Sequence, residues 1–196
     1  MTQLTMKFSA APAVLFLETQ LPIAVVNNLN KYLDALHNKK AESFADKLVG
    51  QISHGEQLKM DPKDKLIELP VMEEVQMGMC AGLSLEGCIP ISIYPRFNFM
   101  MLAINQLVNH MDKMKDMSKG MLVPKVIVRV AVGARKPLNG GSQHTQDFTE
   151  SIKHMLTDTV LVELTEPEQV SSTFEDAYNR DGSTVVVEWG DFYSEK

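Results

Sequence analysis

The sequence predicts an α/β fold in which a largely parallel sheet is flanked by helices on both faces. Short β-branched runs alternate along the chain with segments of helical periodicity, and short connections join them. Ile89–Tyr94 is bounded by prolines, and Pro90 within it excludes a helix, because proline cannot occupy a helix interior. Lys125–Val132 contains VIVRVAV, a β-branched run typical of a central buried strand. In folds of this class, functional groups lie at the ends of strands.

The first third of the chain is expected to supply one helix and two short strands. Leu21–His37 carries apolar residues at close to helical spacing. Leu48–Ile52 and Leu66–Val71 are predicted to be strands, separated by a polar loop that contains Asp61-Pro62. The second of these strands leads directly to a helix that begins at Glu73.

The remaining elements continue the alternation. Phe97–Lys115 is the most periodic helix, since its apolar residues fall on one stripe at spacings of three and four. Gly133–Gln143 is the clearest loop, and it follows a core strand. Val160–Leu164 and Thr184–Glu188 are predicted to be strands, with Pro167–Tyr178 as the helix between them.

Two glycines mark the helix that begins at Glu73. Gly78 and Gly82 are four residues apart and therefore lie on one face. Each costs about 1 kcal/mol relative to alanine in a helix interior. The pair predicts that another helix or a ligand approaches the backbone closely at this face.

Length and composition indicate one domain that spans residues 1–196. The chain has 44% hydrophobic and 22% charged residues, which is typical of a soluble globular protein. The net charge of −6 argues against nucleic acid as a partner, because nucleic-acid binding calls for clustered Lys and Arg.

Cysteine usage and the N-terminal segment predict a cytoplasmic protein that does not bind membranes. Cys80 and Cys88 both lie in apolar stretches, so we expect two reduced, buried thiols. The N-terminus carries no convincing secretory signal, and the apolar run Ala10–Leu17 is too short to span a bilayer.

A set of spaced residues resembles one enzyme family. The set consists of a glutamate, three glycines, a proline, an aromatic pair and a glutamine-flanked histidine: Glu73, Gly78, Gly82, Gly87, Pro90, Phe97-Asn98-Phe99 and Gln143-His144-Thr145-Gln146. It resembles the thiamine-diphosphate enzymes, and more narrowly the beta subunit of 2-oxo acid dehydrogenase first components of the pyruvate dehydrogenase type. The similarity runs from about Leu66 to Leu164, in the transketolase-like domain that binds the aminopyrimidine ring. The resemblance implies an α/β pyrimidine-binding domain.

The resemblance implies that Glu73 is the catalytic, cofactor-binding glutamate. Thiamine diphosphate acts by losing a proton from its thiazolium carbon, and the carbon nucleophile so formed attacks a 2-oxo acid or a ketose. The cofactor's own amino group takes that proton after the aminopyrimidine shifts to its imino tautomer. This shift requires an acid beside the pyrimidine ring nitrogen. A carboxyl group in a dry site suits this task, because burial raises its pKa. Glu74 stands next in the chain and is the alternative; both also fit a helix's first turn, where carboxylates are stabilised by the helix dipole.

The residues after the strand Ile89–Tyr94 are implied to lie at the cofactor ring. Phe99 matches the aromatic that packs against the aminopyrimidine, a contact that adds about 0.5–1.5 kcal/mol beyond area burial. Phe97 and Pro95 are implied to line the same ring, although a phenylalanine here also suits a core. Arg96 and Pro95 stand where the family has other residues. Arg96 is suited to a substrate carboxylate or phosphate, and a surface salt bridge is the alternative.

His144 matches the histidine at the active-site mouth of the family. A histidine there can protonate or orient the substrate-derived intermediate. A solvated loop histidine is the alternative, and the neighbouring Gln143 and Gln146 favour the catalytic role.

The sequence predicts that this chain holds only half of the cofactor. The family binds the diphosphate and Mg²⁺ through Gly-Asp-Gly followed by Asn-Asn, and neither Asn27-Asn28 nor Asp181-Gly182 completes that motif. No His, Cys or carboxylate cluster has metal-ligand spacing, so no metal site is expected in this chain. The resemblance implies a diphosphate-binding alpha-like subunit that holds Mg²⁺, a shared interface site and a heterotetramer.

The implied activity is decarboxylation of a 2-oxo acid, or transfer of a ketol or acyl unit, which would make the protein an oxidoreductase or transferase subunit. The family's beta subunits continue into a C-terminal domain, which we expect this chain to lack, so the resemblance does not extend to docking of a lipoyl acyltransferase. Two alternatives remain: a non-catalytic scaffolding or regulatory relative that pairs with a partner, and an unrelated α/β ligand-binding domain.

Overall fold

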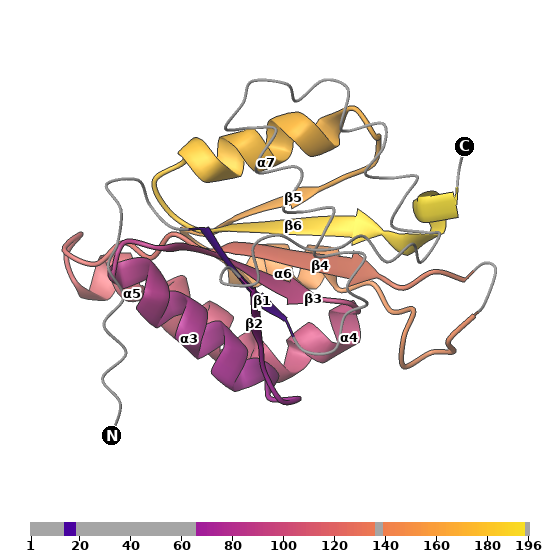
Figure 1. The fold of residues 1–196 in the computed structure, drawn as a ribbon, viewed down its shortest axis with the longest axis horizontal. Helices are drawn as coiled ribbons and strands as arrows, with labels where there is room; N and C mark the ends of the chain where they lie inside the picture. Colours follow the sequence, from indigo (N-terminus) through magenta and orange to yellow (C-terminus); the bar gives the residue numbers. More distant parts are fainter. Residues whose placement is uncertain (1–13, 19–65, 136–138, 195–196) are drawn as a thin grey trace.

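A parallel sheet forms the centre of the molecule. The computed structural model describes residues 14–18, 66–135 and 139–194 (Figure 1). Within these residues one six-stranded sheet has the order β2-β1-β3-β4-β6-β5, and every neighbouring pair is parallel. Its strands are β1 (Val14–Glu18), β2 (Leu66–Glu68), β3 (Ile89–Tyr94), β4 (Ile127–Val132), β5 (Val160–Glu163) and β6 (Thr184–Trp189). The predicted α/β fold with a largely parallel sheet is confirmed.

Helices cover both faces of this sheet, as predicted. In Figure 1, α3 (Glu73–Leu85) and α4 (Phe97–Met100) lie on one side and α7 (Gln169–Asn179) on the other. The hydrophobic core joins the strand residues Val128, Val130 and Val187 to buried residues of the first helix layer. All six residues of β3 and of β4 are buried, in keeping with central strands of a parallel sheet.

The termini of the elements differ from the sequence prediction for physical reasons. β2 ends at Glu68 rather than Val71, because Pro70 has no N–H to donate to a neighbouring strand. β1 was not predicted, and it occupies the position between β2 and β3. The predicted helix Leu21–His37 and strand Leu48–Ile52 lie outside the described residues.

The helical segment predicted over Phe97–Lys115 is present but irregular. It passes from α4 through a 3₁₀ turn (Met101–Ala103) and a π-helical turn (Gln106–Met111) to α5 (Met114–Met117). The predicted apolar stripe forms its inner side, where Met100, Leu107 and Met111 are buried.

One further helix, α6 (Thr149–Met155), was also missed by the sequence analysis. Its start is fixed by Asp147, whose Oδ1 accepts hydrogen bonds from the Thr149 N–H at 2.8 Å and its hydroxyl at 2.6 Å. With seven residues, the helix is too short to show a clear apolar period.

The two glycines of α3 are not forced by packing within the described part of the chain. A Cβ on Gly82 would meet nothing within 4 Å, and one on Gly78 would make only ordinary contact with the Gln106 side chain at 3.8 Å. The close approach that these glycines predict is therefore not made by the described residues. Gly87, by contrast, needs its φ of +86° to turn the chain from α3 into β3.

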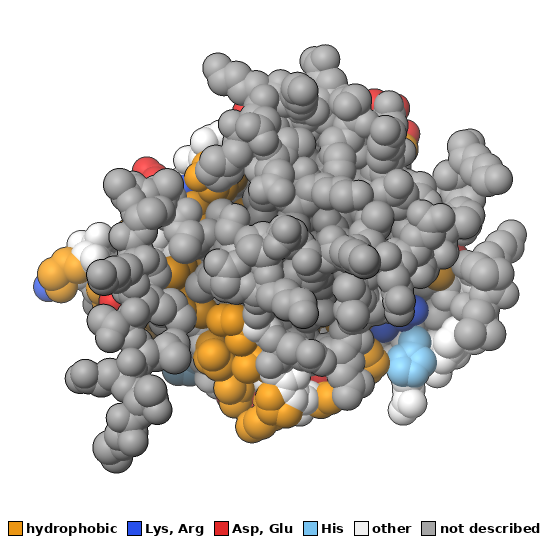
Figure 2. All heavy atoms as spheres, in the orientation of Figure 1, with side chains coloured by type: hydrophobic (Ala, Val, Ile, Leu, Met, Phe, Trp, Pro, Cys, Tyr) orange, Lys and Arg blue, Asp and Glu red, His pale blue; other side chains and the backbone are white. Residues whose placement is uncertain are grey.

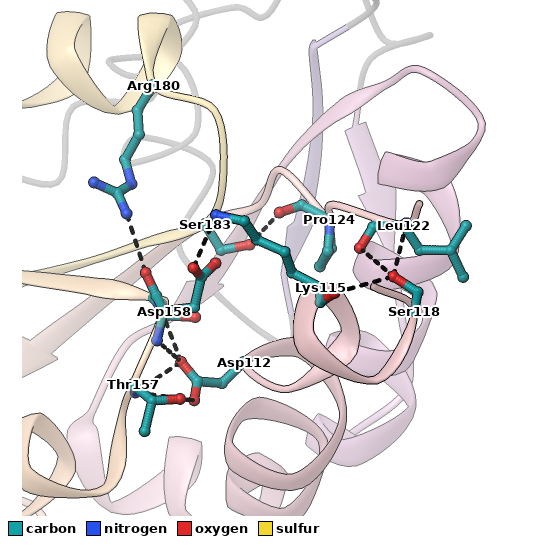
Figure 3. Close-up of polar contacts among 10 residues, drawn as sticks. Asp112, Lys115, Ser118, Leu122, Pro124, Thr157, Asp158, Arg180 and Ser183 are labelled. Carbon is teal, nitrogen blue, oxygen red and sulfur yellow. Dashed lines mark hydrogen bonds and ion pairs between the residues drawn. The ribbon is translucent and has the colours of Figure 1, made fainter. Parts of the chain in front are cut away.

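Asp112 fixes the irregular helical segment to the turn before β5, at the edge where the strands begin (Figure 3). Its side chain is fully buried and accepts hydrogen bonds from the N–H groups of Thr157, Asp158 and Thr159 at 2.8–3.1 Å. The Thr157 hydroxyl and the Lys113 ammonium each donate to it at 2.8 Å. Burial alone would raise the pKa of Asp112, but these bonds outweigh burial and hold that pKa well below its usual range.

Both cysteines are buried free thiols, as predicted. Burial raises the pKa of Cys80 to about 12, so this thiol stays protonated. No described helix has the length and hydropathy required to cross a membrane.

Candidate functional site

The candidate residues gather at the edge of the sheet where the strands end. β2 leads into the start of α3, β3 leads into Pro95 and α4, and β4 leads into the loop that carries His144. Figure 1 shows the start of α4 and the long loop after β4 at the same end of the sheet. Because parallel strands end at one edge, residues far apart in the sequence meet there.

The two adjacent glutamates have different environments. Glu73 is 4% exposed. Glu74 is exposed, and its Oε1 accepts hydrogen bonds from Asn105 Nδ2 at 3.5 Å and Gln106 Nε2 at 3.3 Å. No hydrogen bond or ion pair joins the Glu73 carboxylate to another described residue. Glu73 is thus the buried carboxylate that remains available to a ligand.

The start of α3 is held firmly against β3. The Tyr94 hydroxyl donates to the Glu73 backbone oxygen at 3.3 Å. Gln76 Nε2 donates to Ser92 Oγ at 3.0 Å and to the Ile93 backbone oxygen at 3.1 Å. Burial raises the pKa of Tyr94 well above its usual range, so the hydroxyl stays protonated as a donor. These bonds fix the backbone position of Glu73.

The residues after β3 divide between core and surface. Phe97 is fully buried and packs edge-on against Phe148, with ring centroids 5.8 Å apart. Phe99, Pro95 and Arg96 are only half-buried. Phe97 therefore anchors the start of α4, while the other three retain exposed surface beside it.

His144 packs on Phe99. Their ring centroids are 5.6 Å apart and the rings meet edge to face. The His144 N–H and the Thr145 hydroxyl both donate to the Gly141 oxygen, at 2.9 and 3.1 Å. Gly141 adopts a φ of +81°, which permits this tight turn. The structure thus joins two of the predicted site residues directly.

Two contacts that position His144 were not predicted. Asn98 Nδ2 donates to Gln146 Oε1 at 2.7 Å, which ties the loop to α4. At Gly133, directly after β4, a Cβ would stand 1.8 Å from the His144 oxygen, so only glycine fits. A glycine at the end of a strand was the only sequence signal for this close approach.

The described residues contain no group of three or more His, Cys, Asp or Glu side chains able to hold a metal ion. His110 lies in the π-helical turn and His154 in α6, and His54 lies outside the described part. Three of the predicted site residues thus carry the candidate functional groups at this edge. They are the carboxylate of Glu73, the ring of Phe99 and the imidazole of His144.

The chain is similar to curated proteins over part of its length, and no protein-family model matches it. Pyruvate dehydrogenase E1 component subunit beta, mitochondrial, of Saccharomyces cerevisiae is 34% identical over 85 residues, which cover 43% of this chain and 23% of the yeast protein. The Caenorhabditis elegans protein of the same name is 32% identical over 90 residues, covering 46% and 25%. Pyruvate dehydrogenase E1 component subunit beta of Rickettsia conorii is 30% identical over 91 residues, covering 46% and 27%.

The aligned segments span about a quarter of these relatives. A solved structure described as split gene transketolase, an inactive beta4 tetramer, superposes with a TM-score of 0.49 and 14% identity, covering 90% of this chain and 44% of that one. The resemblance drawn from the residues is confirmed by the curated relatives: a stretch of 85 to 91 residues in this chain is similar to beta subunits of the pyruvate dehydrogenase E1 component.

Proposed function

We propose that this chain is the pyrimidine-binding, beta-like subunit of a two-component thiamine-diphosphate enzyme. The Glu73 carboxylate carries the proposal, because it is buried and receives no hydrogen bond from the described residues. A largely buried carboxylate with no protein donor can pair with a ligand that supplies one. The aminopyrimidine ring of thiamine diphosphate offers a nitrogen that can share a proton with a carboxyl group.

The neighbouring residues fit the same ring. The half-buried Phe99 offers a face for stacking, and Pro95 is half-buried at the end of β3. Phe97 is fully buried, so its part would be to hold α4, and through it Phe99, in position. Bound thiamine diphosphate would supply the carbon nucleophile that attacks the substrate carbonyl.

Glu73 and His144 would each handle a proton, Glu73 at the cofactor ring and His144 at the substrate. Glu73, held by the Tyr94 and Gln76 contacts of α3, would hold a proton at its carboxyl oxygen toward the pyrimidine nitrogen. His144, held against Phe99, would orient the substrate or donate a proton to it. The substrate would be a 2-oxo acid that is decarboxylated, or a ketose or acyl donor whose unit is transferred.

A second subunit would complete the site. Met72, Val75 and Met79 are exposed apolar residues on one side of α3, beside the open surface of Gly82. Figure 2 shows hydrophobic side chains gathered at the lower margin, where Figure 1 draws α3. An exposed apolar helix face of this kind supports an interface. The partner would be a diphosphate-binding alpha-like subunit that holds Mg²⁺, in a cytoplasmic heterotetramer.

Calorimetry tests the shared site. Thiamine diphosphate with Mg²⁺ is titrated into this chain alone, into an alpha-like subunit from the same organism, and into their mixture. The expected result is tight binding only in the mixture. Normal association of the two proteins with no cofactor binding would instead support a scaffolding subunit.

A further inference from the structure

Arg96 is a basic residue without an acidic partner in the described part of the chain. The protein contains 25 acidic and 19 basic residues, so carboxylates are in excess. Even so, no ion pair within 4.0 Å joins Arg96 to a described carboxylate. Its Nη1 donates to the adjacent Pro95 backbone oxygen at 2.7 Å, which occupies one of the five N–H donors of a guanidinium.

The other arginines differ. Arg129 makes a buried two-pronged contact with Glu188, with both N···O distances at 2.6 Å. Arg180 donates to the Asp158 backbone oxygen at 3.0 Å. Arg135 is exposed. Arg96 therefore combines partial burial with unused donor capacity.

Arg96 also lies beside the proposed site. A Cβ built on Gly133 would be 1.8 Å from the His144 oxygen and 2.9 Å from Arg96 Cδ, so both groups lie close to one point. His144 in turn packs on Phe99.

We propose that Arg96 determines substrate specificity by binding an anionic group of the substrate beside His144. The planar guanidinium matches the two oxygens of a carboxylate or a phosphate, and partial burial strengthens such a pair. The bond to the Pro95 oxygen limits the motion of the side chain. The site therefore takes a substrate with a carboxylate or phosphate near its reacting carbonyl, and disfavours neutral carbonyl compounds.

This inference rests on the proposed function for the identity of the reaction, but its test does not. The chain contains four arginines, so labelling the arginine side chains with ¹⁵N gives four Nε–H resonances. These are followed by NMR in the full chain without cofactor, while pyruvate or inorganic phosphate is added. Methyl pyruvate is the neutral control, and chloride keeps the ionic strength constant. The variants Arg96→Lys and Arg135→Lys assign the resonances of these two residues.

A saturable shift of the Arg96 resonance with pyruvate assigns a carboxylate, and one with phosphate assigns a phosphorylated substrate. In a calorimetric titration with the same anion, Arg96→Gln should weaken binding about tenfold or more, because a charge-assisted pair is lost. Arg135→Gln should leave it unchanged, and Arg96→Lys should restore part of it. Unchanged positions of the other arginine resonances show that each variant is folded.

An Arg96 resonance that does not move, or that moves only in parallel with Arg135, overturns the inference. Because no thiamine diphosphate is present, that result leaves the proposed cofactor site untouched. Conversely, a failure of cofactor binding in the reconstituted complex does not affect anion binding at Arg96.

Discussion

At the scale of single residues, two buried acidic side chains have opposite environments. Asp112 accepts hydrogen bonds from three backbone N–H groups, a hydroxyl and an ammonium. The Glu73 carboxylate receives none from the described residues. A fully satisfied buried carboxylate stabilises the structure around it, whereas an unsatisfied one costs stability unless a ligand pairs with it. Asp112 therefore supports the fold, and Glu73 remains the residue proposed for the site.

Replacing Asp112 with asparagine should destabilise the protein at neutral pH. The amide of the variant presents an NH₂ group to donors that meet a carboxylate oxygen in the wild type. The free energy of unfolding should therefore fall by about 3 kcal/mol. In a chain of this size, that loss corresponds to a fall in Tm of about 6–12 °C. Thermal unfolding followed by circular dichroism measures the change. Asp116→Asn is the matched control, because Asp116 is exposed on α5, and it should leave Tm unchanged.

The same residue predicts how stability depends on pH. The folded-state pKa of Asp112 is lowered, so its contribution is fully present above the ordinary pKa of aspartate, about 3.9. That contribution is lost as the pH falls from there toward the lower folded-state value. The free energy of unfolding, measured with urea across this range, should fall more steeply in the wild type than in Asp112→Asn. Parallel curves would show that Asp112 does not titrate in this way.

At the scale of elements, the loop after β4 depends on Gly133. In Gly133→Ala the new Cβ would overlap the His144 backbone oxygen, so the loop must move away from Arg96 and Phe99. Stability should fall by about 1–3 kcal/mol, and the NMR contact between the His144 and Phe99 rings should disappear. A Gly133→Ala protein with an unchanged Tm and an intact contact would disprove this close approach.

On the surface of α3, replacing a glycine with alanine should raise stability, whereas the same change at Gly133 should lower it. Gly82 has open space at its Cβ position, so Gly82→Ala should stabilise the isolated chain by about 0.5–1 kcal/mol through helix propensity. If the partner packs on this face, the same methyl group should weaken association of the two subunits. Urea unfolding measures the first effect and analytical ultracentrifugation of the mixture measures the second. Tighter association of the variant would exclude a close contact at Gly82.

Some elements were predictable from local sequence and others were not. Ile89–Tyr94 was predicted with its observed bounds, because its β-branched residues and flanking prolines exclude other structures. β1 was missed, since the five-residue segment VLFLE is too short to show a clear period, and its role depends on pairing with β2 and β3. The 3₁₀ and π-helical turns after α4 were missed, because an apolar stripe looks alike in all helix types.

The sequence proposes a set of site residues but not their geometry. Sequence spacing selects Glu73, Phe99 and His144, which remains a prediction, and the structure adds that Glu73 is buried whereas Glu74 is exposed. The contact of Asn98 with Gln146 and the close packing at Gly133 join residues from different elements. Contacts of this kind depend on tertiary structure, which no local pattern contains.

At the scale of the whole molecule, the parallel sheet brings α3, α4 and the loop after β4 to one edge, while Asp112 fixes the opposite edge (Figures 1 and 3). The exposed apolar side of α3 leads away from Glu73 and is the surface proposed for a second subunit. This arrangement separates the structural carboxylate of Asp112 from the carboxylate proposed to bind the cofactor. It also makes the proposed enzyme dependent on assembly.

The most direct measurement compares Glu73→Gln with Glu74→Gln in the reconstituted complex. Glu73→Gln should weaken thiamine-diphosphate binding or lower turnover by about 10- to 100-fold, as expected for the loss of a charge-assisted hydrogen bond of about 1.5–3 kcal/mol. Glu74→Gln removes an exposed carboxylate that bonds only side chains of the neighbouring helical segment, so it should leave both quantities nearly unchanged. Wild-type affinity and turnover in Glu73→Gln would contradict the assignment of Glu73 to the cofactor.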